Sequence, residues 1–150
     1  MEVANAVSLT ILTSFAAPLL LYIGTTDFFY LKLFVGLLLA NVGVETVKPM
    51  FGSLGFFGRP AGATACDSFC IGGPVGGRPG FPSGHMTNVS MLVSALWFHT
   101  GTPTVLWVGL PWISAMAWAR WKKQCHNWEQ ILAGVCTGTV LGGLLSAISS

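Results

Sequence analysis

Charged side chains are scarce in this sequence. Its 150 residues include 7 Lys or Arg and 5 Asp or Glu, so 8% are charged, whereas 53% are hydrophobic and the mean hydropathy is +0.69. A soluble domain usually carries about 25% charged residues, so this composition excludes an ordinary soluble domain and indicates an integral membrane protein. The few carboxylates form no cluster along the chain that would bind a metal ion, and no basic run indicates a nucleic-acid partner.

Cysteine is also scarce, and the four cysteines do not form the framework of a disulfide-rich domain. Cys136 lies in an apolar run, where we expect it to pack as a small hydrophobic side chain. Cys66 and Cys70 lie in a long loop, and Cys125 directly precedes His126. A structural zinc site would need a second cysteine pair, so these residues do not predict one. They leave three states open: a Cys66–Cys70 disulfide, a Cys66–Cys125 disulfide, or free thiols.

The N-terminal region contains no Lys or Arg before Lys32. The uncharged stretch over residues 3–24 is too long for the apolar part of a signal peptide, which would also begin with a basic segment. It is long enough to cross a hydrocarbon core of about 30 Å, so we expect a retained membrane span. Pro18 predicts a kink within that span, which membrane helices tolerate.

Further apolar segments follow, and together they predict an all-α, polytopic membrane helix bundle forming a single domain over residues 1–150. The expected spans are residues 3–24, 28–47, 84–101, 104–120 and 128–148. Residues 49–83, between the second and third spans, are rich in Gly and Pro and too polar to cross the bilayer. A loop of this length is usually functional or disordered, and its two Arg-Pro pairs favour function.

The order of about five spans decides which loops share a side of the membrane. The second and fourth spans end, and the third and fifth begin, on the same side. Most cationic and imidazole side chains therefore gather on one face: Lys48, Arg59, Arg78, His85, Arg120 and His126. The opposite face receives Asp27, the turn at His99 and the C-terminus. We expect any polar site to lie on the first face.

One four-residue stretch on that face combines features of a ligand-binding helix start. Pro82 fixes the backbone before the third span, Ser83 is suited to cap the helix, and Gly84 lets the backbone approach a ligand. His85 falls in the first turn, where backbone N–H groups favour an anion and an imidazole can donate or accept a proton. Taken alone, the stretch is equally typical of a simple helix start.

Fixed cations and two histidines at a membrane interface suit a phosphate group. Arg binds phosphate oxygens in a bidentate manner, Lys adds a point charge, and both stabilise charge that develops in the transition state. One histidine can attack phosphorus while the other protonates the leaving oxygen. The competing interpretation is that the cations only anchor the chain among lipid head groups. The five-residue spacing between Arg120 and His126, together with residues 82–85, favours the phosphate site.

These residues resemble the motifs of the type 2 phosphatidic acid phosphatases (PAP2), also called the acid phosphatase/vanadium haloperoxidase superfamily. The three motifs of that family are K-x6-RP, PSGH and SR-x5-H-x3-D. The second is intact at residues 82–85, and the third reads ARWKKQCHNWEQ over residues 119–130. The first is looser, because ten residues separate Lys48 from Arg59-Pro60. The resemblance covers residues 48–130, and the order of the motifs agrees with their expected placement on one face.

The resemblance implies a role for each matching residue. His126 would be the nucleophile and His85 the general acid, with no metal and no other cofactor. Lys48 either pairs with Glu45 at the interface or faces the site, and we favour the site. The phosphate-binding set that the resemblance implies is Lys48, Arg59, Ser83, Gly84 and Arg120, with Arg78 as a rival to Arg59.

The third motif departs from the family pattern at Gln130, where the family has Asp. An Asp would orient His126 and support its developing charge, whereas Gln130 can orient the ring without neutralising it. Branches that resemble dolichyl-diphosphate phosphatase accept Gln here, so the resemblance favours a polyprenyl or lipid diphosphate among lipid phosphate substrates. The alternative is a catalytically inactive PAP2-like membrane protein with a structural or lipid-binding role. A vanadate-dependent peroxidase fits poorly, because those relatives are large and soluble.

The resemblance also bears on orientation and partners. Most Lys and Arg residues lie on the site face, which the positive-inside rule would place in the cytosol. Since most of them are proposed phosphate ligands, we follow the resemblance and expect a lumenal or extracytoplasmic site face. The expected partners are a lipid phosphate or diphosphate substrate and membrane lipids. In the last span Gly134, Gly138 and Gly142 recur every fourth residue and form a surface for close helix packing that an oligomer could use.

Overall fold

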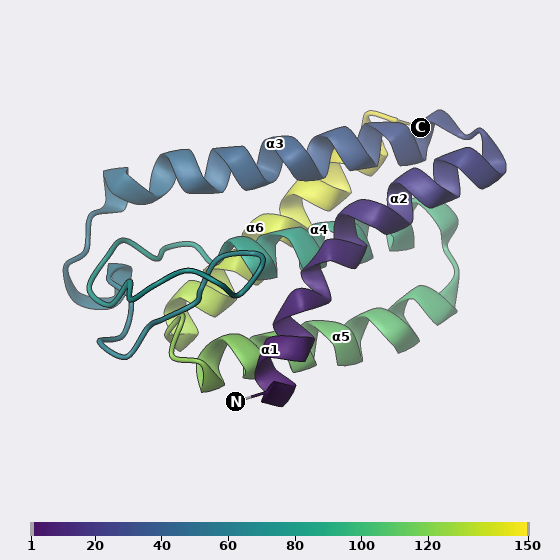
Figure 1. The fold of residues 1–150 in the computed structure, drawn as a ribbon. Helices are drawn as coiled ribbons and strands as arrows, with labels where there is room; N and C mark the ends of the chain where they lie inside the picture. The colour runs from purple at the N-terminus through teal and green to yellow at the C-terminus, as the bar shows by residue number, and fades with distance from the viewer. Residues whose placement is uncertain (1, 150) are drawn as a thin grey trace.

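The computed structural model describes residues 2–149, and in that range it is helical without a β-strand (Figure 1). The predicted all-α fold class is therefore confirmed, while the outermost residues of the predicted domain, 1 and 150, lie outside the described range. The helices in chain order are α1 (Glu2–Leu9), α2 (Ile11–Thr25), α3 (Phe28–Phe51), the short 3-10 helix η1 (Gly55–Phe57), α4 (Gly84–Thr100), α5 (Pro103–Lys122) and α6 (Trp128–Ala147).

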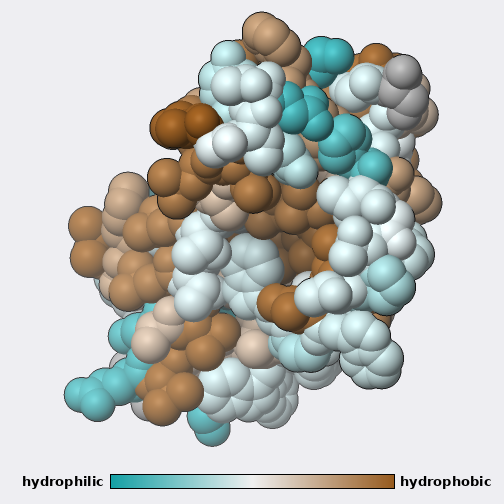
Figure 2. All heavy atoms as spheres, turned by 90° about the vertical axis from the view of Figure 1, so that its right-hand side faces the viewer, coloured by the Kyte–Doolittle hydropathy of each residue, from teal (hydrophilic) through white to brown (hydrophobic). Residues whose placement is uncertain are grey.

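Three stretches of the described chain are long and apolar enough to cross a membrane: Glu2–Thr25, α3 and α6. Together with the composition they fit a membrane protein. The helix α4 has 17 residues and is enclosed by its neighbours, since every residue from Gly84 to Ala95 is buried. Figure 2 views the end of the bundle where α2 meets α3, and there hydrophilic residues form only small separate patches among apolar ones. The membrane crossings of α4 and α5 stay predictions.

The N-terminal span differs from the expected helix kinked at Pro18. The structure interrupts it at Thr10, between α1 and α2, and keeps Pro18 inside α2. The hydroxyl of Thr10 donates to the carbonyl of Val7 (2.6 Å) and accepts from the indole N–H of Trp112 (2.7 Å). A side chain bonded in this way competes with the backbone ladder, which explains why the break falls at Thr10.

The helix α6 packs closely along α4. Gly134, Gly138 and Gly142 form its contact face, and a Cβ on any of them would come within 3.0 Å of α4 atoms or of Ser83. The glycine face that we expected an oligomer to use is therefore occupied by α4 of the same chain. Cys136 lies on the opposite side of α6 and is exposed, so it does not pack against the other helices of this chain.

The helix α3 runs further than the predicted 28–47. It continues through Lys48 and Pro49 to Phe51, so the loop begins at residue 52 rather than 49. Its other end is capped by Asp27, whose carboxylate accepts from the backbone N–H of Phe29 (2.9 Å). Because α3 extends past Lys48, that side chain leaves from a helix with a fixed direction. The extension of α3 thus fixes the position of Lys48, the first predicted phosphate ligand along the chain.

Candidate active site

Four helix ends meet at one end of the bundle. There α3 and α5 finish, α4 and α6 begin, and the loop 52–83 closes over them (Figure 1). The structure therefore brings together the loops that the order of the spans predicted to share one side of the membrane. Within the loop, the backbone N–H of Arg59 donates to the carbonyl of Arg78 (2.9 Å), which sets the two Arg-Pro pairs side by side.

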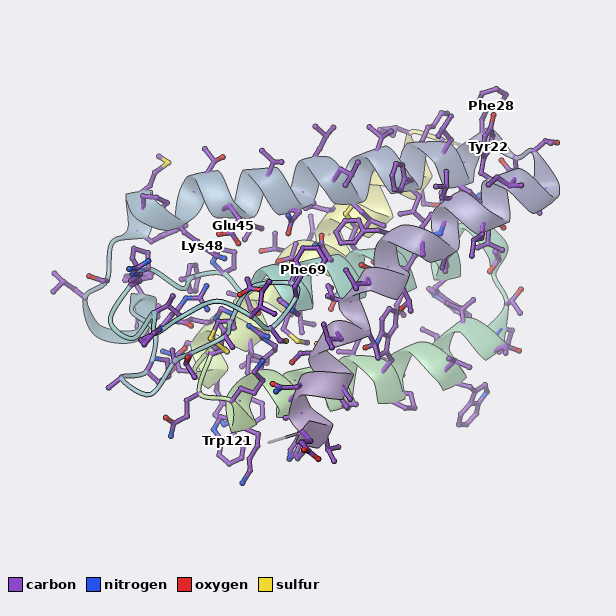
Figure 3. The ribbon with its side chains drawn as sticks, in the orientation of Figure 1. Tyr22, Phe28, Glu45, Lys48, Phe69 and Trp121 are labelled. Carbon is purple, nitrogen blue, oxygen red and sulfur yellow. A yellow bond between two sulfur atoms is a disulfide. The ribbon has the colours of Figure 1, made fainter. Side chains whose placement is uncertain are left out.

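A cavity of about 500 Å³, here called the polar pocket, lies between α3, the loop and the starts of α4 and α6. Figure 3 shows Glu45 and Lys48 on the side of α3 that faces the loop. The ammonium group of Lys48 forms an ion pair with Glu45 and still lines the pocket, so both interpretations of Lys48 hold at once. The charged and catalytic candidates on its wall are Lys48, Arg59, Arg78, Gly84, His85 and His126, together with the carboxylates of Glu45 and Asp67.

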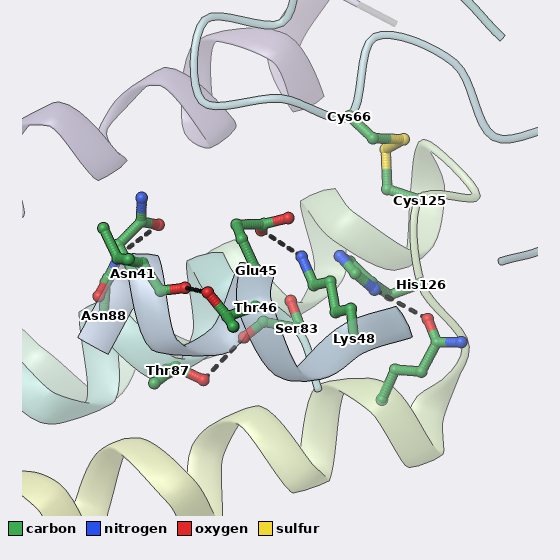
Figure 4. A network of polar contacts seen from close by, with 12 residues as sticks. Asn41, Glu45, Thr46, Lys48, Cys66, Ser83, Thr87, Asn88, Cys125 and His126 are labelled. Atoms are coloured by element: carbon green, nitrogen blue, oxygen red, sulfur yellow. Dashed lines mark hydrogen bonds and ion pairs between the residues drawn. A yellow bond between two sulfur atoms is a disulfide. The ribbon is translucent and has the colours of Figure 1, made fainter. Parts of the chain in front are cut away.

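The ring of His126 is held from behind by Gln130. Its Nδ1 lies 2.8 Å from the side-chain oxygen of Gln130, whose Nε2 donates to the carbonyls of Phe56 and Gly58 (2.8 Å each). Since the Gln130 amide nitrogen faces two acceptors, its oxygen must face His126, and Nδ1 must carry the proton. The second nitrogen, Nε2, then holds the lone pair. Figure 4 shows this ring beside Lys48.

A guanidinium group approaches that lone pair. The Nη1 of Arg59 lies 3.4 Å from His126 Nε2 and donates to the carbonyl of Cys125 (3.1 Å). Burial, followed by the charges of Arg120 and Arg59, lowers the pKa of His126 well below its usual value, so the ring is neutral. Burial also lowers the pKa of Arg59, opposed by the charge of Glu45, but an arginine stays protonated. A neutral imidazole beside a fixed cation suits nucleophilic attack on an anion.

The guanidinium of Arg120 lies behind the pocket wall rather than on it. This side chain is fully buried, with Nη2 donating to the carbonyl of Cys66 (2.6 Å) and Nη1 to the hydroxyl of Ser8 (3.4 Å). The predicted ligand role therefore does not match the position of Arg120, whose donors are largely taken by the loop and by α1. Its charge still reaches the site, since it contributes to the lowered pKa of His126.

Several buried polar atoms near the site have no hydrogen-bond partner among the described residues. They are Ser83 Oγ, His85 Nε2 and Arg120 Nε. Ser83 stands at the N-cap position of α4, but its side chain makes no capping bond, so the expected cap is wrong. Buried polar groups are normally paired, and unpaired ones need a reason. Of the three, His85 lines the polar pocket, so its unpaired Nε2 is the atom that an anion bound there could partner.

A disulfide joins the loop to the turn before His126. Of the three states left open by the sequence, the structure has the Cys66–Cys125 bond, while Cys70 is free. Lys123 is buried beside it and donates to the carbonyl of Ala65 (2.9 Å). The disulfide therefore links the part of the loop that binds Arg120 to Cys125. This residue directly precedes His126, the proposed nucleophile.

Some residues of this site carried no sequence signal. The carboxylate of Asp67 lines the pocket and accepts from the backbone N–H of Phe69 (2.8 Å), Ile71 (3.3 Å) and Gly72. Desolvation alone would raise the pKa of Asp67, but these hydrogen bonds outweigh it and hold the pKa below its usual value. Ser8 also reaches the site, from the other end of the chain. Across residues 2–149 no three His, Cys, Asp or Glu side chains group to hold a metal ion.

One of three comparisons with known proteins finds a match. A model described as the PAP2 superfamily matches residues 15–150, which include every candidate residue named above except Ser8. No curated protein and no solved structure matches the chain.

Proposed function

The chain belongs to the PAP2 superfamily, and from that membership and the polar pocket we propose that it hydrolyses a lipid phosphate or diphosphate through a phosphohistidine. Proteins of this superfamily are generally phosphatases that act on phosphate esters, often those of lipids. The observation that carries the proposal is the pair of contacts that the ring of His126 makes, from which its tautomer is inferred. Its Nδ1–H is held by Gln130, which leaves the Nε2 lone pair directed to a cationic pocket.

In the first step, Nε2 of His126 attacks the terminal phosphorus of the substrate. The bond that breaks joins this phosphorus to the lipid oxygen in a monophosphate, or to the bridging oxygen in a diphosphate, which then leaves as the lipid monophosphate. The leaving oxygen takes a proton from His85, whose Nε2 is buried and unpartnered within the described chain. His85 must enter this step as an imidazolium and become neutral, and a phosphate anion in the pocket favours the charged form. Arg59 and Lys48 balance the charge that develops on the phosphoryl oxygens.

In the second step, water attacks the phosphohistidine. The nitrogen–phosphorus bond breaks, inorganic phosphate leaves, and the proton of the water goes to His85, which restores the starting state. No step uses a metal ion, because the charge on the phosphoryl group is met by side-chain cations. Among possible substrates we favour polyprenyl and other lipid diphosphates, on the resemblance at Gln130.

The orientation of the site follows from the disulfide in this proposal. A Cys66–Cys125 bond persists in an oxidising compartment and is reduced in the cytosol. This supports a multi-pass chain whose site faces the lumen or the outside of the cell.

A second candidate is the catalytically inactive, lipid-binding PAP2-like protein. It is favoured by one observation, since Arg120 gives its Nη2 to the carbonyl of Cys66 instead of to the pocket. In that case the pocket would bind an anionic head group without turning it over.

Phosphate release separates the two candidates. We would compare native protein, His126→Ala and His99→Ala on phosphatidate and on a polyprenyl diphosphate; His99 serves as a matched control because it lies at the opposite end of the bundle, stacked on Phe29. We expect His126→Ala to lose at least about a thousandfold in rate and His99→Ala to keep it within about twofold. An acid-labile phosphoryl label should form on native protein and on His99→Ala but not on His126→Ala. Equal rates for native protein and His126→Ala would remove the enzyme proposal.

A further inference from the structure

Two carboxylates line the polar pocket, although the pocket is proposed to bind an anion. They belong to Glu45 and Asp67. The oxygens of Asp67 accept backbone N–H groups of its own loop, so this carboxylate shapes the loop. Glu45 differs, because its hydrogen-bond partner within the described chain is the side chain of Lys48. A negative charge at this position opposes the binding of phosphate, so the presence of Glu45 calls for an explanation.

The carboxylate of Glu45 lies beside two pocket cations and the start of α4. Its Oε1 pairs with the ammonium group of Lys48 (Figure 4) and would be 3.5 Å from a Cβ placed on Gly84, the first residue of α4. Burial lowers the pKa of Arg59 and the charge of Glu45 opposes this shift, so the carboxylate also acts on the second cation. The first backbone N–H groups of a helix favour an anion, and the side chain of Ser83 does not cap them. The anion that the structure shows at this helix start is therefore a carboxylate of the protein itself.

The ion pair between Glu45 and Lys48 is asymmetric. The side chain of Glu45 is 58% exposed, whereas that of Lys48 is 6% exposed. The two residues are three positions apart on α3, so the pair can open by rotation about side-chain bonds without any movement of the helix. A phosphoryl group that binds Lys48 would release a carboxylate that can turn toward solvent. The buried ammonium group would then have an anionic partner at every stage, which a buried charge requires.

Resting on the phosphate site of the proposed function, we propose that Glu45 determines how firmly the polar pocket holds a phosphoryl group, by competing with it for Lys48 and the start of α4. Competition of this kind weakens the binding of substrate and of inorganic phosphate alike, so it raises KM. Its benefit is the release of inorganic phosphate, which the pocket cations would otherwise retain after the phosphohistidine is hydrolysed. Glu45 precedes the first motif, which begins at Lys48, so this role lies outside the three motifs.

The first test measures phosphate binding without turnover. Inorganic phosphate is titrated into each protein in detergent micelles at constant ionic strength, and the rise in unfolding temperature gives its affinity. Glu45→Gln removes the charge and keeps the shape, while Glu45→Asp keeps the charge. Glu129→Gln is the matched control, because Glu129 is exposed at the start of α6 and does not line the polar pocket. We expect Glu45→Gln to bind phosphate at least about tenfold more tightly than native protein, and the other two variants to stay within about threefold.

Turnover of p-nitrophenyl phosphate provides an independent second readout. In Glu45→Gln, KM and the inhibition constant of inorganic phosphate should both fall at least about tenfold, while kcat stays the same or falls because the product leaves more slowly. A general loss of structure cannot produce this pattern, since it would weaken binding. Glu45→Ala removes the same charge and serves as the second variant if Glu45→Gln does not fold.

The outcomes separate the role of Glu45 from the function. If neither native protein nor any variant binds phosphate, the polar pocket is not a phosphate site, and the proposed function and this inference fail together. If Glu45→Gln binds phosphate as native protein does, or more weakly, Glu45 does not compete and the inference is overturned, while the phosphatase proposal stands. Tighter binding by Glu45→Gln in a protein that hydrolyses no substrate would support the inference and favour the catalytically inactive candidate.

Discussion

Replacing Gln130 by Glu exchanges the side-chain nitrogen for an oxygen in the group that holds His126, the proposed nucleophile. Gln130 is fully buried, and its Nε2 lies 2.8 Å from the carbonyl oxygens of both Phe56 and Gly58. In Gln130→Glu a carboxylate oxygen takes the place of that nitrogen and faces two acceptors. Two hydrogen bonds are lost, and two buried carbonyls lose a donor.

The cost follows from those contacts. Each of the two buried carbonyls that loses its donor costs about 1 to 3 kcal/mol, so we expect Gln130→Glu to reduce the free energy of unfolding by about 2 to 6 kcal/mol at pH 7. The introduced carboxyl can recover one bond only by taking up a proton, so the deficit against native protein should shrink as the pH is lowered from 8 to about 5.

The assay is the apparent unfolding temperature in detergent, measured against pH for native protein, Gln130→Glu and Gln124→Glu. The control Gln124 is exposed, so the same chemical change there costs little. We expect Gln130→Glu to unfold roughly 5–15 °C lower at pH 7 and its kcat to fall, because the ring of His126 loses its support. Equal unfolding temperatures for the two variants at pH 7 would refute the assignment of the Gln130 amide, and with it the tautomer of His126.

Three further predictions concern the same pocket. Reducing the Cys66–Cys125 bond, which closes 59 residues, should cost about 4 kcal/mol of stability and lower phosphatase activity reversibly, checked by assaying before and after reoxidation. Arg59→Ala should lower kcat/KM about a hundredfold and Arg78→Ala less than tenfold, because only the guanidinium of Arg59 has a resolved contact with His126 in the described structure. Because burial lowers the pKa of His126, kcat/KM should hold down to about pH 6.5 and fall only below it, as a pH profile on p-nitrophenyl phosphate would show. The stability that this neutral ring contributes is likewise lost as pH falls from about 6.5 through its folded pKa, in unfolding measurements over that range.

The helices and the face of the site could be predicted because they depend on local features. Apolar runs fix where helices form, and the order of the spans fixes which loops meet. The bounds of α4, α5 and α6 accordingly lie within about two residues of the prediction. The break at Thr10 was missed because it depends on the indole of Trp112, about a hundred residues away. No pattern within the first span could have revealed it.

The contacts that hold the site were less accessible to sequence reasoning. The residue types of Lys48, Arg59, His85 and His126 identified the pocket wall, since each carries its chemistry in its own side chain. The partner of Arg120 is a backbone carbonyl, which every residue possesses. Which carbonyl is used depends on the path of the loop and on the disulfide. That path depends on tertiary packing, so the motif alone could not predict that the Arg120 guanidinium lies behind the wall of the polar pocket.

The loop also relates the two departures from the family motifs to each other. The first motif is four residues longer than K-x6-RP, and the extra length contains η1, which carries Phe56 close to Gln130. A carboxylate at position 130, where the family has Asp, would face backbone carbonyls of the longer loop and could not donate a hydrogen bond to them. The amide of Gln130 donates to those carbonyls. We predict that the amide compensates for the longer loop.

A double-mutant cycle tests that coupling. Its members are native protein, a deletion of residues 54–57, Gln130→Asp, and the combination. If the longer loop requires the amide, each single change should lower kcat/KM strongly. The fold-loss of the combined variant should then be smaller than the product of the two single fold-losses by at least about tenfold. The deletion also removes aromatic contacts between Phe57 and Phe81, so stability is measured in parallel to separate folding from turnover. If the fold-loss of the combined variant equals the product of the two single fold-losses, the carbonyls of the loop do not determine which residue can support His126.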